Sequence, residues 1–142
     1  MSHPLVPTAA ERAAPALAVP LAAALGLSLL DESAPEHGVH FVVSALAGNG
    51  VGGAHAAALS AAMELAAYLA VLPELAPDEH AVTHASAVQL IVVAPVGERV
   101  EATARLLRRS RRLAFLEVEA TCDGHIVALG QLTKSVVTVR PT

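Results

Sequence analysis

The chain has 142 residues and a formal net charge of −4 at pH 7, with 54% hydrophobic but only 2% aromatic residues. This length is typical of one domain, whose core is built here from alanine, valine and leucine rather than from rings. The acidic balance argues against a nucleic-acid partner, which requires a basic face. The single cysteine, Cys122, excludes an internal disulfide and any multi-cysteine metal site.

The first twenty residues contain four prolines and lack the basic start and apolar run of a secretory signal. We therefore expect an irregular arm over residues 1–20, with at most a helical turn in Ala9–Leu17, followed by one domain over residues 21–142. No uninterrupted apolar run has the length of a membrane span. The sequence thus predicts a cytoplasmic protein with no membrane partner.

A short helix and two strands are predicted before the glycine-rich turn in the middle of the chain. Leu21–Leu25 predicts a helix that Gly26 closes, and residues 26–32 and 37–46 predict strands. A glycine-rich turn over residues 48–55 then leads into a helix over His55–Leu72, which Pro73 ends.

Beyond Pro73 the pattern is typical of strands only. Residues 99–107 alternate apolar and polar side chains, as half-buried antiparallel strands do. Arg108–Arg112 predicts a charged turn, and the Asp-Gly pair after Cys122 predicts a hairpin. The four predicted strands cover residues 81–93, 99–107, 113–121 and 126–139.

The central helix is apolar on nearly its whole circumference, so it belongs in a core. One helix and one sheet bury each other if the sheet curves around the helix. The sequence therefore predicts an α+β fold, a curved antiparallel sheet wrapped around one long helix. Long strand edges and a core of small side chains favour a homo-oligomer, a dimer or a tetramer.

Glu64 is the one carboxylate in this helix. Between residues 56 and 72 only Ser60, Glu64 and Tyr68 have polar side chains, and their four-residue spacing places them on one stripe. A carboxylate in such surroundings loses hydration, and ionisable groups of this kind concentrate in active sites. We interpret Glu64 as a functional residue.

The start of the same helix is a second candidate feature. Asn49 opens the glycine-rich turn, and free amides near Ala56 at the helix N-terminus suit an anion or a developing oxyanion. At 1.5 Å per residue, Glu64 lies more than two turns away. Both groups can act on one carbonyl only if a second protomer brings its own Glu64 opposite these amides.

These motifs resemble the hot-dog-fold acyl-CoA thioesterases of the phenylacetate-pathway type. That family has an Asn, a glycine-containing turn, His-Gly-Gly and then an acidic residue in the central helix, matched here by Asn49, His55 and Glu64. The resemblance continues through residues 95–100 and 108–119 and covers about Leu21–Val139. Two departures are Ala56-Ala57 in place of Gly-Gly, and Ala94 where relatives often have Arg or Lys.

The resemblance implies a hot-dog fold and hydrolysis of an acyl-CoA or acyl-carrier-protein thioester, without a cofactor other than the coenzyme A of the substrate. It assigns catalysis to Glu64, as general base or nucleophile, to the Ala56 amide as oxyanion donor, and to Asn49. The implied substrate-binding residues are Gly53, His55, Ala57, Ser60, Tyr68, Arg109 and Arg111.

Several residues have a simpler structural interpretation. Asn49 is a good turn former, His55 is a candidate helix-start residue, and the arginine cluster is a candidate solvated hairpin. His80 and His84 have a metal-like spacing but no third ligand nearby, so we predict no metal site.

Two other functions are considered. A fatty-acid-type dehydratase would have His fourteen residues before the helix acid, where this chain has Gly50, so that activity is nearly excluded. The alternative is a non-catalytic acyl-thioester-binding protein or a subunit of a biosynthetic assembly. Ala56-Ala57 favours this alternative and Glu64 disfavours it.

Overall fold

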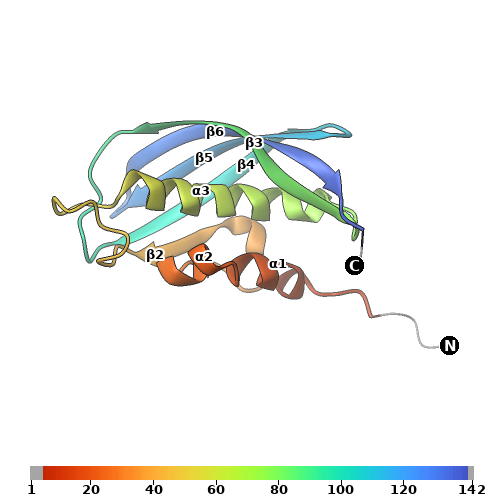
Figure 1. The fold of residues 1–142 in the computed structure, drawn as a ribbon, viewed down its shortest axis with the longest axis horizontal. Helices are drawn as coiled ribbons and strands as arrows, with labels where there is room; N and C mark the ends of the chain where they lie inside the picture. Colours follow the sequence, from red (N-terminus) through yellow and green to blue (C-terminus); the bar gives the residue numbers. More distant parts are fainter. Residues whose placement is uncertain (1–4, 141–142) are drawn as a thin grey trace.

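A computed structural model describes residues 5–140, and it shows a six-stranded antiparallel sheet curved around one long helix (Figure 1). The long central helix α3 spans Ala56–Val71. It packs chiefly against the neighbouring strands β4 and β5. The predicted α+β, hot-dog architecture is confirmed.

The remaining elements follow the predicted order. The helices are α1 (Ala9–Leu17), α2 (Pro20–Leu25) and the short 3₁₀ turns η1 (Pro35–His37) and η2 (Leu72–Glu74). The strands are β1 (Ser28–Leu29), β2 (Val39–Val42), β3 (Glu79–Leu90), β4 (Arg99–Arg109), β5 (Leu113–Cys122) and β6 (His125–Thr138).

The strand order in the sheet is β1-β2-β4-β5-β6-β3, with every neighbouring pair antiparallel. Strands β4, β5 and β6 form a meander, and β3 joins it beside β6. The two edges therefore differ: β1 has only two residues, whereas β3 has twelve. In residues 5–140, the outer edge of β3 pairs with no strand.

The core lies between α3 and the inner face of the sheet. Helix α3 buries several alanines together with larger side chains such as Met63 and Leu69. Burying one such large side chain stabilises a fold by about 1.5–3 kcal/mol. By length and composition alone Ala56–Glu74 could cross a membrane, but in this fold it is the helix that the sheet encloses.

The N-terminal arm is more regular than predicted. Residues 9–17 form helix α1 rather than an irregular segment with one turn, because Thr8 and Glu11 make a capping box. The Thr8 side chain accepts from the Glu11 amide at 3.1 Å, and Glu11 Oε2 accepts from the Thr8 amide at 2.8 Å. Pro15 lies inside this helix and supplies no amide for the hydrogen bond to the Glu11 carbonyl, yet the helix continues to Leu17. The first predicted strand is also shorter, since only Ser28–Leu29 pairs with β2.

We predict that Gly38→Ala strongly destabilises the fold. Gly38 has φ 114° and ψ −166°, a region that only glycine adopts readily, and an added Cβ would overlap the carbonyl oxygen of Ala102 on β4. Backbone strain of this kind costs about 1–3 kcal/mol before the overlap is counted. Gly124→Ala in the β5–β6 turn is the control: its φ of 73° is also positive, but nothing lies within 4 Å of the added Cβ. Urea unfolding should show a loss of about 1 kcal/mol for the control and a clearly larger loss for Gly38→Ala; equal losses would contradict this explanation.

Candidate active site

Backbone hydrogen bonds fix the glycine-rich turn to the loop between β3 and β4 and to the segment that follows β2. The Ala54 amide donates to the Ala94 carbonyl at 2.8 Å, and the His55 amide donates to the Ala47 carbonyl at 2.7 Å. Asn49 organises the turn itself: its Oδ1 accepts from the amides of Val51 at 2.9 Å and Gly53 at 3.1 Å. The Asn49 side-chain oxygen is thus used within the turn, which matches the simpler structural interpretation of this residue.

His55 is the N-cap of α3. Its Nδ1 accepts from the Ala57 amide at 2.9 Å, and its carbonyl oxygen accepts from the amides of Ala58 and Leu59. The Ala56 amide is different, because within residues 5–140 it has no hydrogen-bond partner. Residues 55–57 are exposed. Helix α3 therefore offers one free N–H to solvent at the positive end of its dipole.

Glu64 lies in the middle of α3, at a half-buried position that lines a pocket of about 340 Å³. Most of the wall is apolar, and much of it comes from α1, α2 and the loops that follow them. The lining residues are Ala16, Val19, Leu21, Ala22, Leu27, Ala61, Glu64, Leu65, Tyr68, His80, Ala81, Val82, Thr83 and Lys134. Eight residues of helix separate Glu64 from Ala56, about 12 Å along the axis, so one protomer does not bring them together.

Lys134 is the functional candidate that our sequence reasoning missed. It lies on β6, is only 3% exposed, and lines the same pocket as Glu64. Its Nζ donates to Thr83 Oγ1 at 3.1 Å. Burial lowers the pKa of Lys134, and the nearby Glu64 carboxylate raises it. The sequence did contain a signal for the buried position of Lys134. It stands two residues from Leu132 and from Val136, and residues with this spacing lie on the same, inward-facing side of a strand.

The other polar residues of the α3 stripe have different positions. Tyr68 lines the pocket, and its hydroxyl lies 3.2 Å from Nδ1 of His80. Burial raises the pKa of Tyr68. Ser60, one turn before Glu64, is half-buried but does not line the pocket.

The two arginines predicted to bind substrate lie at the β4–β5 hairpin, at the opposite end of the molecule from the glycine-rich turn (Figure 1). Arg109 donates to Glu79 Oε1 at 2.7 Å and to the Ser110 carbonyl at 2.9 Å. Arg111 is exposed in the turn. Neither arginine lines the pocket that contains Glu64, and the pairing of Arg109 with Glu79 is a long-range contact that local sequence did not indicate.

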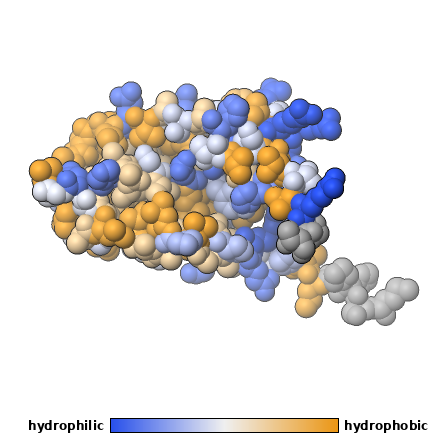
Figure 2. Space-filling model, in the orientation of Figure 1, coloured by the Kyte–Doolittle hydropathy of each residue, from blue (hydrophilic) through white to orange (hydrophobic). Residues whose placement is uncertain are grey.

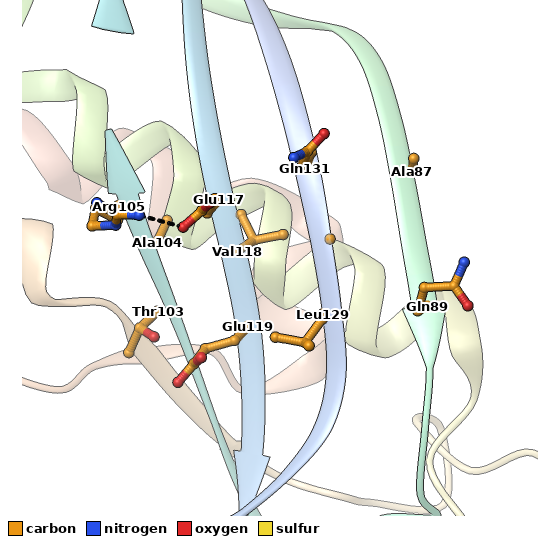
Figure 3. Close-up of a pocket in the computed structure, with 11 residues that line it drawn as sticks. Ala87, Gln89, Thr103, Ala104, Arg105, Glu117, Val118, Glu119, Leu129 and Gln131 are labelled. Atoms are coloured by element: carbon orange, nitrogen blue, oxygen red, sulfur yellow. Dashed lines mark hydrogen bonds and ion pairs between the residues drawn. The ribbon is translucent and has the colours of Figure 1, made fainter. Parts of the chain in front are cut away.

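A larger hollow of about 650 Å³ lies on the face of the sheet opposite α3. Polar side chains of the strands surround it, and Arg105 pairs with Glu117 at 2.6 Å across it (Figure 3). None of the predicted site residues lines this hollow. Because it also lacks a helix terminus or a buried charge, we place the site in the smaller pocket.

His80 and His84, the pair with a metal-like spacing, have different contacts. His80 contacts Tyr68, whereas His84 Nδ1 lies 3.1 Å from Ser135 Oγ. Across residues 5–140, no three His, Cys, Asp or Glu side chains are grouped to hold a metal ion. Cys122 is buried, and burial raises the pKa of its thiol, so it is a poor nucleophile.

Comparison with known proteins gives the family. Residues 40–140 match the model of the fluoroacetyl-CoA-specific thioesterases. The chain belongs to this thioesterase family. A comparison with curated proteins found no match to this chain.

Solved structures agree with the family match. A mutant of the phenylacetic acid degradation protein PaaI from Thermus thermophilus is 32% identical, with a TM-score of 0.71, and the match covers 82% of this chain and 97% of that one. The TT0310 protein of the same organism is 33% identical, with a TM-score of 0.72, over 82% and 96% of the two chains. The BH2602 protein from Bacillus halodurans with CoA is 18% identical, with a TM-score of 0.74 over 82% and 75%, and shares the fold. The thioesterase is a hot-dog thioester hydrolase of the PaaI type.

We predict that Arg109→Met lowers stability without changing the KM for substrate. The change removes the partner of Glu79, whose pKa is lowered by the Ala76 amide and also by Arg109. A carboxyl group whose pKa is lower in the folded than in the unfolded state stabilises the fold at pH values above the ordinary pKa of Glu. This stabilisation is lost as the pH falls through the lowered pKa. The melting temperature should therefore fall by a few degrees at neutral pH and by less in acid.

Arg111→Met is the matched control, because Arg111 supplies only its backbone carbonyl to the hairpin. It should change neither the melting temperature nor the KM. A higher KM in Arg109→Met, with unchanged melting, would instead support the substrate-binding role predicted from the sequence.

Proposed function

We propose that the thioesterase hydrolyses acyl-CoA thioesters at sites shared by two protomers, each site combining the Ala56 amide of one protomer with Glu64 of the other. One observation supports this most strongly. Helix α3 has a free N–H at its exposed start and a carboxylate facing a pocket, yet about 12 Å of helix separates them. Only a second copy of the helix, running in the opposite direction, places both groups on one carbonyl.

In this site the thioester carbonyl oxygen accepts a hydrogen bond from the Ala56 amide. As water attacks the carbonyl carbon, Glu64 takes its proton, and the negative charge that develops on the oxygen is stabilised by the amide and the helix dipole. The tetrahedral intermediate then expels the thiolate, which takes from Glu64 the proton that came from water. Direct attack by Glu64, forming a mixed anhydride that water hydrolyses, uses the same groups. Both routes require Glu64 to be ionised.

The free edge of β3 supports dimer formation. This strand has twelve residues with an unpaired outer edge, and the segment that follows it has exposed apolar side chains, including Ile91, Val92 and Val93. On the face of the molecule seen in Figure 2, apolar side chains are also more frequent toward the end that contains the glycine-rich turn. Pairing of two β3 edges would continue the sheet across the dimer and cover part of this surface. Pairs of dimers could join into a tetramer.

The pocket beside Glu64 supports an aliphatic acyl group as substrate. Its wall includes Ala16, Val19 and Leu21 from the N-terminal segment, which lies outside the residues matched to the family. Tyr68 and His80 are the only ring side chains in the lining, so a stacked aryl group has few partners. Coenzyme A is supported as the thiol because the family description names a CoA thioester, and a structural neighbour from Streptococcus mutans contains acetyl CoA.

We predict that Glu64→Gln preserves folding but lowers turnover of acyl-CoA substrates by about 10²-fold or more, since an amide neither accepts a proton from water nor attacks the thioester. The KM should change little because the loss falls on the transition state. Thiol release from acyl-CoAs of increasing chain length measures both quantities. Glu119→Gln, in the outer hollow, is the control and should hydrolyse at the wild-type rate.

The alternative function gives a different result. A non-catalytic acyl-thioester-binding protein would bind acyl-CoA but release no thiol above background, in the wild type as in Glu64→Gln. Normal hydrolysis by Glu64→Gln would exclude Glu64 from the reaction and leave the fold assignment unchanged.

A further inference from the structure

The pocket beside Glu64 has walls of two kinds. The N-terminal segment supplies an entirely apolar wall, with side chains between Ala16 and Leu27. Helix α3 and strands β3 and β6 supply the other wall, which contains every polar side chain of the lining. These are Glu64, Tyr68, His80, Thr83 and Lys134. An acyl group in this pocket therefore meets hydrogen-bonding groups as well as hydrocarbon.

Lys134 is the most deeply buried of these polar residues. At 3% exposure it is the one buried charged residue within residues 5–140. An ammonium removed from water destabilises a protein unless other charges and hydrogen bonds compensate. Its Nζ carries three N–H donors, and the described residues supply one hydrogen-bond acceptor, the Thr83 hydroxyl at 3.1 Å. The ammonium can therefore donate to a further acceptor.

The position of the ammonium is set by two neighbouring side chains that also line the pocket. Its Nζ lies 3.1 Å from Thr83 Oγ1 on β3 and 6.0 Å from the centre of the Tyr68 ring on α3. The second distance is at the outer limit for a cation–π attraction, so the ring is a weak partner. Because lining residues flank the Nζ on both sides, its remaining N–H groups border the space in the pocket.

Thr83 adds a second donor at the same place. Thr83 and Lys134 are direct cross-strand partners in the β3–β6 ladder, so their side chains lie side by side. The Thr83 hydroxyl oxygen accepts from Lys134, and within residues 5–140 its own O–H has no acceptor. The pairing of the two strands thus brings an ammonium and a hydroxyl together with donors to spare.

The other polar groups of the wall do not use these donors. Tyr68 and His80 contact each other, with the Tyr68 hydroxyl 3.2 Å from His80 Nδ1. Glu64 lines the same pocket, but in the part of the chain that the structure describes Lys134 forms no ion pair with any carboxylate. An oxygen atom on the substrate is the kind of group that would match the two donors.

We propose that Lys134 and Thr83 form a subsite for an oxygen on the acyl chain, so that the preferred substrates are aliphatic acyl-CoAs bearing a hydroxyl or carboxylate group. This inference rests on the proposed function, in which the acyl group enters this pocket. The methylene groups of such a chain lie against the apolar wall, and its oxygen accepts from the two donors. A plain hydrocarbon chain would displace water from the ammonium without supplying an acceptor, which is costly.

The test compares acyl-CoAs of equal chain length that end in a methyl, a hydroxyl or a carboxylate group. In the wild type, kcat/KM should be at least about tenfold higher for an oxygen-bearing chain than for the methyl-ended one, as expected for a hydrogen bond to a charged group. Lys134→Met retains the buried aliphatic stem but has no donor, so this ratio should fall to about one or below. The substituent whose advantage is lost identifies the oxygen that the subsite binds.

Two further variants make the result specific. Thr83→Val has nearly the same shape but lacks the hydroxyl, so it should also lower the ratio, and it decides the question if Lys134→Met does not fold. Arg112→Met removes an exposed cation outside the pocket and should keep the wild-type ratio.

The outcomes separate this subsite from the proposed function. If the wild type hydrolyses all three substrates without preferring an oxygen, or if folded Lys134→Met and Thr83→Val keep the wild-type ratio, the subsite alone is overturned. If the wild type releases no thiol from any of the three, the proposed function is overturned and the subsite with it.

Discussion

The enclosure of α3 is the constraint on which the rest of the structure depends. A helix that is apolar on nearly every side is stable in water only when another element surrounds it, and here one curved sheet does so. The same enclosure fixes the positions of both functional groups. Because α3 is held along its length, the free amide at Ala56 and the carboxylate of Glu64 occupy defined positions on a rigid rod. In the proposed mechanism, this separation is the reason that a second protomer completes the site.

The cost of placing charge in this core explains the arrangement of the pocket. Glu64 and Lys134 come from different elements, α3 and β6, and they line one pocket whose other walls are mostly apolar. Lys134 is the more deeply buried of the two, and the Thr83 hydroxyl accepts a hydrogen bond from its Nζ at 3.1 Å. An apolar wall beside these polar groups suits the proposed substrate, an aliphatic acyl group next to a carbonyl that develops negative charge.

Local patterns were sufficient to predict most of the fold. The four-residue spacing of its few polar side chains indicated α3, apolar-polar alternation indicated the strands, and the Asp-Gly pair indicated the β5–β6 turn, because each pattern depends on neighbouring residues only. Helix α1 was predicted only as a single turn, because the four prolines of the first twenty residues argued against a longer helix and the capping box of Thr8 and Glu11 was not considered. The inward-facing position of Lys134 could be found from the alternation along β6, but its partner Thr83 lies 51 positions away and Glu79, the partner of Arg109, lies 30 positions away, so no local pattern indicated these pairings.

Subunit complementation tests the shared site most directly. Ala56→Pro removes the amide N–H but suits the first position of a helix, and His55 already has the extended backbone that precedes proline, φ −66° and ψ 139°. Alone, Ala56→Pro and Glu64→Gln should each be at least about 10²-fold less active than the wild type. Refolded together, they should form heterodimers with one intact site, and the mixture should regain about a quarter of wild-type activity. A mixture no more active than its parents would contradict a site shared between protomers.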